Sequence, residues 1–180
     1  MKKIALVVDN SGSLTKEEME KIHITKMIPI SFIVNGEEYY ENQNMTYEEF
    51  YRFLADKKTD DSTSQPSIEM IKEEWRNILK DYDELVYIIL SSGLSESCNT
   101  AINASHTDEF EGKVFVVNNQ RVAYMNKMAM FEARYMIDNG KSGKEIKEYL
   151  EKTRGECGVY IAVDTLRYLK KGGRVTPAAA

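Results

Sequence analysis

Short apolar runs that alternate with helix-like stretches are the feature that most constrains the fold of this chain. The runs that we expect to be strands cover residues 4–8, 85–90, 113–117 and 159–163. Runs this short and this apolar are typical of parallel strands that are covered on both faces. The intervening stretches have the spacing of βαβ units. We therefore predict an α/β fold, with a mostly parallel sheet and helices on both faces.

Turn and cap residues mark the ends of the other predicted elements. Asn35-Gly36 is a strong signal for a hairpin between strands within 27–34 and 37–40. The residues that suit the N-cap of a helix are Thr15, Thr46, Ser67, Ser142 and Asp164. Residues 57–62 are charged and are expected to form a loop. These signals fill the intervals between the predicted parallel strands with helices and one hairpin.

Composition excludes several classes of function. The 180 residues are 42% hydrophobic and 29% charged, which is ordinary for a globular protein with one sizeable core. The net charge of −5 argues against nucleic acid and anionic membrane surfaces as partners. No stretch is long and apolar enough to span a membrane. Cys98 and Cys157 are far apart and have no metal-site spacing, so we expect a reduced, cytoplasmic protein without a metal.

Hydroxyl-rich loops follow the predicted strands, at the edge where α/β folds bind ligands. In residues 91–97, Ser92 or Ser95 suits the N-cap of the next helix, where an anion or carboxylate is held well. The plainer interpretation is a strand-to-helix turn with a hydroxyl cap, as in most α/β proteins. Residues 63–67 likewise read alone as a turn. Together the two loops favour a carboxylate site if they converge at one sheet edge.

Catalytic motifs are weak in this sequence. A serine nucleophile needs a base, and the two histidines, His23 and His106, do not follow a predicted strand. The sequence contains no Gly-x-Ser-x-Gly elbow, no Gly-x-Gly-x-x-Gly and no phosphate loop. Asp9 follows the first strand and suits a metal or phosphotransfer site, but a single acid is more simply a cap or turn residue.

Five stretches in order resemble the motifs of the DegV family of bacterial fatty-acid-binding proteins. They are Asp9-Asn10-Ser11-Gly12-Ser13-Leu14; Pro29-Ile30 with Gly36, Tyr39, Tyr40 and 47–51; Thr63-Ser64-Gln65-Pro66-Ser67; Ser91-Ser92-Gly93-Leu94-Ser95; and Leu166, Tyr168-Leu169 with Gly172-Gly173-Arg174-Val175. Each motif is modest alone, but their order and spacing fit from residue 4 to the end.

The resemblance implies a fold and a role. Family members have a first α/β domain like the one predicted here, and bind a long-chain fatty acid between it and a second domain. In characterised relatives the protein presents the fatty acid to a separate fatty acid kinase, and the resemblance implies the same role here, without enzyme activity. Carried onto this chain, Thr63 with Ser92 or Ser95 would bind the carboxylate, and Ser64 and Arg174 would support the head group. No cofactor is implied.

Three departures from the family pattern bear on this expectation. Residues 1–176 correspond to the first domain and 177–180 to a tail, so the second domain is expected to be missing. Glu96 adds a negative charge beside the proposed carboxylate site. Asn118-Asn119 stands where the family has Asp-Ser. A lone domain would expose apolar surface, so a homodimer is a reasonable expectation.

Two other functions stay open on the sequence. One is a phosphotransferase- or hydrolase-type enzyme that uses Asp9 and the serine loops. The other is an interaction module that has lost lipid binding, which Glu96 and the expected missing domain would favour.

Overall fold

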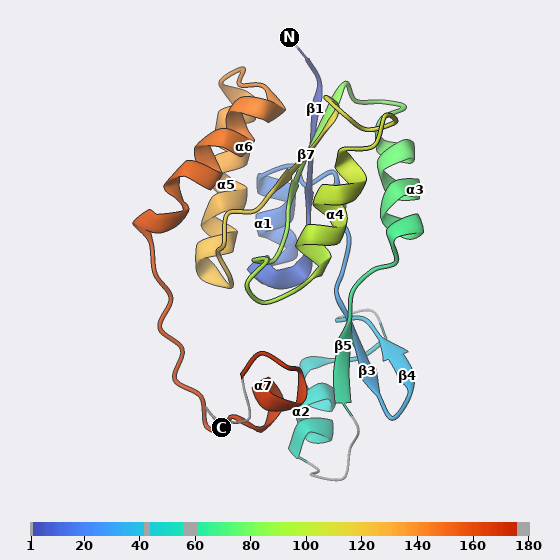
Figure 1. Ribbon diagram of the computed structural model, residues 1–180, viewed down its shortest axis with the longest axis vertical. Helices are drawn as coiled ribbons and strands as arrows, with labels where there is room; N and C mark the ends of the chain where they lie inside the picture. The colour runs from blue at the N-terminus through green and yellow to red at the C-terminus, as the bar shows by residue number, and fades with distance from the viewer. Residues whose placement is uncertain (1, 42–43, 56–60, 176–180) are drawn as a thin grey trace.

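The structure is a computed structural model that describes residues 2–41, 44–55 and 61–175 (Figure 1). Its strands are β1 (Ile4–Val8), β2 (Lys26–Met27), β3 (Ser31–Val34), β4 (Glu37–Tyr39), β5 (Asp61–Ser64), β6 (Glu84–Ile88) and β7 (Val114–Val117). Its α-helices are α1 (Lys16–Lys21), α2 (Tyr47–Ala55), α3 (Ile68–Ile78), α4 (Ser97–Ser105), α5 (Tyr124–Asp138), α6 (Gly143–Lys152) and α7 (Arg167–Lys171). Two short 3-10 helices, η1 (Asn10–Gly12) and η2 (Thr153–Glu156), complete the elements. The tail predicted over 177–180 lies outside the described residues.

The larger sheet is parallel, as predicted. In the described residues it has four strands in the order β2-β1-β6-β7. β1 and β6 are buried at every position, which explains why their sequences are continuous apolar runs rather than alternating ones. Their carboxyl ends lie side by side because Val8 pairs with Ile88. The loops after these two strands therefore start at the same edge of the sheet.

Helices cover both faces of this sheet (Figure 1). α3 and α4 pack on one face, where Trp75 is fully buried with Tyr87 and Phe110 edge-on to its ring. α1, α5 and α6 cover the other face, where Met130 and Leu150 are fully buried. The predicted two-faced α/β architecture is thus confirmed. None of the described helices combines the length and the apolar character that a membrane crossing requires.

A smaller antiparallel sheet, in the order β4-β3-β5, lies beside the larger one. Asn35 and Gly36 both have positive φ, at 53° and 87°, so the predicted hairpin turn is confirmed. β5 was not predicted, because residues 57–62 read as a charged loop. Residues 56–60 lie outside the described residues, and 61–62 belong to β5, where Thr63 pairs with Phe32. Strand pairing with β3 overrode the polar composition.

The strand predicted over residues 159–163 is wrong. The described structure has no strand there, and Tyr160 and Ile161 are 102% and 66% exposed. Residues 159–163 are a continuous apolar run that suits a strand, but a strand forms only where another one offers hydrogen bonds. The next helix also begins later than predicted. Leu166 rather than Asp164 occupies the N-cap of α7, although Thr165 Oγ1 accepts a hydrogen bond from the Arg167 amide at 3.2 Å.

The helix caps predicted at Thr15, Thr46, Ser67 and Ser142 are confirmed. Thr15 and Ser142 form capping boxes with Glu18 and Glu145. Ser67 accepts a hydrogen bond from the Met70 amide at the start of α3. The reciprocal bonds between Thr46 and Glu49 precede and open α2. Local sequence therefore determines where these helices begin.

Candidate functional site

Residues 91–97, which we call the serine loop, connect β6 to α4 at the carboxyl edge of the large sheet. Three consecutive backbone amides at its centre donate within the protein. Those of Leu94 and Ser95 donate to the Ser91 carbonyl, at 2.9 and 3.1 Å, and that of Gly93 donates to Ser91 Oγ at 3.2 Å. These amides are therefore not available to an anion, contrary to the expectation that the backbone would cradle it. Side-chain hydroxyls are the donors that this loop can offer.

The start of α4 differs from the prediction. Glu96, and not Ser92 or Ser95, occupies the N-cap position, and its side chain makes no capping hydrogen bond. Instead Glu96 is exposed and accepts a hydrogen bond at 3.0 Å from Asn99, one turn along the helix. The charge of Glu96 thus lies on the outer surface of α4, and Ser95 Oγ accepts from the Ser97 amide in its place at 3.3 Å.

Ser92 and Ser95 are both half-buried and both have hydrogen-bonded hydroxyl groups. Ser92 Oγ accepts a hydrogen bond from the side-chain nitrogen Nδ2 of Asn118 at 2.8 Å. Ser95 Oγ lies 2.8 Å from Oγ of the buried Ser97. That pair shares one hydrogen, so a second hydroxyl hydrogen remains to be donated elsewhere. The two serines are held in place by neighbours that the sequence motif alone does not identify.

Asp9, directly after β1, holds Leu90, the residue that precedes the serine loop. One carboxylate oxygen accepts from the Leu90 amide at 2.7 Å, and the other accepts from the Ser11 amide at 3.0 Å and from the Ser11 hydroxyl. Burial raises the pKa of the Asp9 carboxyl, and these hydrogen bonds oppose that increase only in part. Asp9 therefore ties the end of β1 to the end of β6. Its oxygens face protein donors rather than an open site.

A buried polar chain continues from Asp9 across the sheet edge. Ser11 Oγ accepts from Asn126 on α5 at 2.8 Å, and Asn126 Oδ1 accepts from Asn119 at 2.9 Å. Asn119 Oδ1 in turn accepts from the Arg121 amide at 2.9 Å. Sequence reasoning missed Asn126 because it lies inside a helix and far from any motif. Every member of this chain bonds to its neighbour, so the exits of β1 and β7 are held at fixed positions.

Arg174 is brought to the serine loop from the far end of the chain. Its Nε donates to the Leu94 carbonyl at 3.2 Å, and its Nη1 donates to the Gly172 carbonyl. α7 is anchored to α2, because the Tyr168 hydroxyl donates to the Leu54 carbonyl near the end of that helix at 2.7 Å. The polypeptide between 167 and 174 therefore bridges α2 and the serine loop.

Thr63 and Ser64 lie on β5 and are not joined to the serine loop by any hydrogen bond among the residues that the structure describes. Thr63 is exposed. Ser64 is half-buried, and its hydroxyl donates to the Gln65 carbonyl at 3.3 Å. The structure thus connects Arg174 with the loop of Ser92 and Ser95, whereas the second hydroxyl motif stands on a neighbouring sheet.

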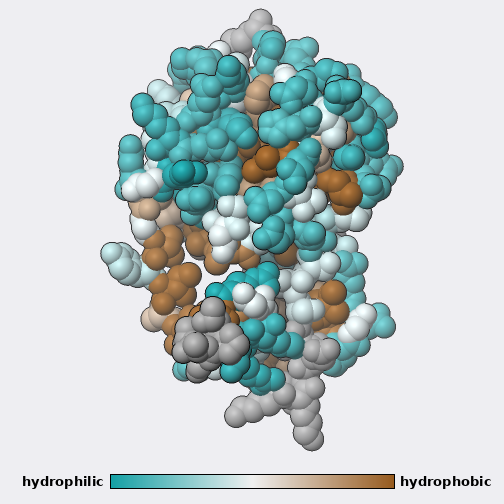
Figure 2. Space-filling model, viewed as in Figure 1, coloured by the Kyte–Doolittle hydropathy of each residue, from teal (hydrophilic) through white to brown (hydrophobic). Residues whose placement is uncertain are grey.

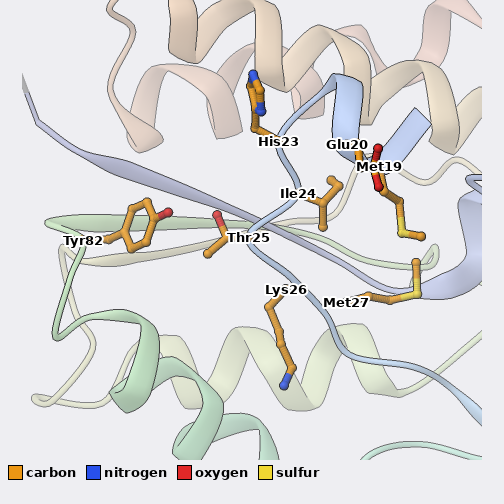
Figure 3. Close-up of a pocket in the computed structure, with 8 residues that line it drawn as sticks. All are labelled: Met19, Glu20, His23, Ile24, Thr25, Lys26, Met27 and Tyr82. Atoms are coloured by element: carbon orange, nitrogen blue, oxygen red, sulfur yellow. The ribbon is translucent and has the colours of Figure 1, made fainter. Parts of the chain in front are cut away.

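Two open pockets of the described surface lie elsewhere. One has a volume of about 660 Å³ and is lined by α1, β2 and the residues around them, with His23 and Tyr82 on its walls (Figure 3). The other, of about 530 Å³, lies where β6 and β7 begin and includes His106. Neither pocket is lined by a residue of the serine loop. Within the described ranges no group of three or more metal-binding side chains comes together.

Among the described residues, no group that could activate a serine as a nucleophile lies beside the serine loop. His106 pairs with Glu111 at 2.9 Å on the outer surface, and His23 lines the pocket beside α1. Burial raises the pKa of the Cys98 thiol to about 11, so it is protonated at neutral pH. Among the described residues the serine loop therefore has neither an imidazole base nor a thiolate beside it.

Comparison with known proteins agrees with this fold and these motifs. The chain matches the family described as "Uncharacterised protein, DegV family COG1307" over residues 3–180. A DegV domain-containing protein of Staphylococcus aureus strain N315 is 30% identical over 176 residues, which are 98% of this chain and 62% of that protein. The chain thus spans about three fifths of the length of such curated relatives.

Solved structures place the chain in the same group. A structure described as fatty acid binding of a DegV family protein from Thermus thermophilus has a TM-score of 0.82 at 26% identity, covering 98% of this chain and 62% of that one. DegV of Bacillus subtilis, described as a fatty acid binding protein, has a TM-score of 0.79 at 26% identity, over 96% and 61%. A stearic acid-binding protein of Eubacterium ventriosum has a TM-score of 0.76 at 27% identity, over 99% and 63%. With the motifs, the fold and these matches in agreement, the chain belongs to the DegV family.

Proposed function

We propose that this chain binds the carboxylate of a long-chain fatty acid at the serine loop and does not act as an enzyme. The observation that carries the proposal is the set of donors at this edge. The three central amides of the loop are bonded internally, so Ser92, Ser95 and Arg174 supply side-chain hydrogens and the positive charge. Hydroxyls and a guanidinium are well suited to a carboxylate. Solved relatives described as fatty-acid-binding support the same ligand class.

Thr63 and Ser64 are the second part of the proposed head-group site. They lie on β5, and the Thr63 side chain is exposed. The segment that contains α7 connects α2 to the serine loop. In this proposal both hydroxyl motifs contact one carboxylate.

Apolar surface for an acyl chain is present beside this site. Figure 2 shows hydrophobic side chains along the extended segment that leads to α7, next to an opening between the two parts of the molecule. This segment includes Val159, Ile161 and Val163, each at least 44% exposed. We propose that part of the acyl tail lies along it, because burying a methylene group is worth about 0.8 kcal/mol.

Presentation of the bound fatty acid to a separate kinase is the finer part of the proposal. Ser92 and Ser95 are half-buried and Arg174 is exposed, which would leave a bound carboxylate accessible to a second protein. The measurement is acyl phosphate formation by a fatty acid kinase with ATP, with and without the chain. A rate that the chain does not change would contradict this step.

The enzyme alternative is disfavoured by Asp9. A catalytic or metal-binding carboxylate must reach a substrate or ion, but Asp9 is 1% exposed and both of its oxygens accept hydrogen bonds from the protein. Turnover of phosphate or ester substrates that is lost in Asp9→Asn, with the fold intact, would revive that alternative.

The test is direct binding by the 180-residue chain. Purified protein is denatured and extracted for bound lipid, which mass spectrometry identifies, and oleate affinity is measured by calorimetry. A charge-assisted hydrogen bond is worth about 1.5–3 kcal/mol, so Ser95→Ala is expected to weaken oleate binding roughly tenfold or more. Ser105→Ala is the matched control, because it removes a hydroxyl at the other end of α4. No bound lipid and no oleate uptake would instead support an interaction module without lipid binding.

A further inference from the structure

Ser97 is a buried serine at the start of α4, two residues after Ser95. It is 1% exposed, and its Oγ lies 2.8 Å from Ser95 Oγ. Its backbone amide also donates to Ser95 Oγ, at 3.3 Å. Ser95 Oγ is the one hydrogen-bond partner that the described residues offer to the Ser97 hydroxyl. The two serines therefore form a pair in which Ser95 is half-buried and Ser97 is enclosed.

The burial of Ser97 decides which hydroxyl donates in this pair. A serine hydroxyl has one hydrogen to donate and two lone pairs that accept. If Ser95 donated to Ser97, the hydrogen of Ser97 would be buried without an acceptor among the described residues, which is unfavourable. The Ser97 hydroxyl is therefore the donor, and Ser95 Oγ is the acceptor.

This direction leaves the Ser95 hydroxyl with one role. Its Oγ accepts from the hydroxyl and from the amide of Ser97, which occupies both lone pairs. Its own hydrogen is then left for a group outside the pair, and accepting hydrogen bonds makes a hydroxyl a stronger donor. In the described structure Glu96 does not take this hydrogen, because its carboxylate is exposed and accepts from Asn99 at 3.0 Å.

We propose that Ser97 is a positioning residue of the head-group site, which holds the Ser95 hydroxyl as a hydrogen donor to the carboxylate of a bound fatty acid. The inference rests on the proposed binding of fatty acids at the serine loop. Ser97 acts through Ser95 and does not contact the ligand, because its own side chain is enclosed.

α4 gives Ser97 a fixed position. Ser97 is the first residue of this helix, and Cys98 and Ala101 of the same helix are fully buried in the core on that face of the large sheet. The Ser95 hydroxyl is thus oriented by a packed helix rather than by the loop to which it belongs. A donor that is oriented before the ligand arrives loses little freedom on binding, so it contributes more to affinity.

The experiment measures oleate affinity by calorimetry on the full chain and on three variants at residue 97. Ser97→Ala should weaken oleate binding roughly threefold to tenfold, which is the effect of losing a neutral hydrogen bond that orients the donor. Ser97→Thr keeps a hydroxyl on the same carbon and should stay within about twofold of the parent. Ser97→Cys keeps a side chain of similar size but donates weakly, so it should bind oleate as Ser97→Ala does.

Two further variants separate positioning from a general effect on α4. Ser105→Ala removes another buried hydroxyl of α4, which donates to the Ile102 carbonyl at 2.8 Å, and should leave oleate affinity unchanged. In Ser95→Ala, the added change Ser97→Ala should have an effect of less than about twofold, because the residue through which Ser97 acts is then absent. A merely structural role of Ser97 would persist in that background.

The outcomes distinguish this inference from the function on which it rests. If the unmodified chain binds no oleate, the proposed function fails and the role of Ser97 fails with it. If the chain binds oleate and folded Ser97→Ala binds it equally well, only the role of Ser97 is overturned. A loss that Ser97→Ala shows equally in the Ser95→Ala background overturns it as well. Should Ser97→Ala not fold by circular dichroism, Ser97→Cys decides, and affinity equal to that of the parent in that variant overturns the inference.

Discussion

Hydrogen-bond donors, rather than a cation, surround the carboxylate of Asp9 in the described structure. The Leu90 amide and both donors of Ser11 point to its two oxygens. This arrangement holds the first residues of the serine loop without exposing a charge to the site. The sequence predicts that Asp9 is either a turn residue or part of a functional site. In the structure its side chain positions the ends of two strands.

The raised pKa of Asp9 predicts a specific pH dependence. Between the ordinary value of 3.8 and its raised value in the fold, the folded protein binds more protons than the unfolded one. The contribution of Asp9 to the free energy of unfolding therefore falls as pH rises through this window. Urea unfolding of the parent and of Asp9→Asn, followed from about one pH unit below 3.8 upward, measures this contribution. A stability difference that is constant with pH would contradict the assignment.

Glu145, at the start of α6, has the opposite effect on the pH dependence of stability, because its pKa is lowered rather than raised. The Ser142 amide and hydroxyl, with Lys141, lower the pKa of Glu145 from 4.5 to about 2. Glu145 thus stabilises the protein above pH 4.5, and this contribution is lost as pH falls toward 2. In Glu145→Gln, the loss of stability relative to the parent should be largest at neutral pH and should shrink in acid. Glu148→Gln, on the exposed face of α6, is the control, and an equal acid dependence in both variants would refute the role of the capping box.

The helices on the large sheet depend on a few buried side chains, and Trp75 of α3 is the largest. It is fully buried and contacts Tyr87 and Phe110 edge-on, with ring centroids 6.3 and 5.2 Å away. Trp75→Ala should lower the free energy of unfolding by about 3–5 kcal/mol, from lost burial and the cavity left behind. Chemical unfolding followed by circular dichroism measures it, and Tyr135→Ala, at a side chain that is 70% exposed, should change stability by less than about 0.5 kcal/mol. A loss for Trp75→Ala no larger than the control would show that this packing is dispensable.

Elements whose signal is local are readable from the sequence, and those that need a distant partner are not. Asn35-Gly36 and the cap at Ser142 carry their conformation within a few residues, so the hairpin and α6 are predicted correctly. β5 forms only because β3 offers its edge, and residues 159–163 stay unpaired because no described strand does. At the candidate site, the serines are visible in the motif. Asn118 and Asn126 are not, because their roles follow from contacts across the sheet edge.

At the scale of the whole molecule, residues 159–163 form an apolar segment that the described residues leave uncovered. Residues 159–163 combine exposed side chains with a backbone that no described strand pairs, which is the usual signature of a surface that associates. We expect the 180-residue chain to self-associate as concentration rises, in line with the homodimer expected from its sequence. Ile161→Lys should lower the weight-average mass measured by sedimentation equilibrium, and Tyr149→Lys, on the exposed face of α6, should have less effect. Equal masses for the parent and Ile161→Lys at all concentrations would exclude this surface.

The bond between Arg174 and Leu94 also has a consequence in time. The two residues are 80 positions apart, and a ribosome adds about 5–20 residues per second, so roughly 4–16 s separate their synthesis. The large sheet can begin to form while Arg174 is still unmade, since β1, β6 and β7 all precede it. The serine loop of a nascent chain would therefore be made seconds before Arg174 is synthesised. Acquisition of the ligand would then be a late event in the maturation of the protein, timed by translation rather than by folding of the sheet.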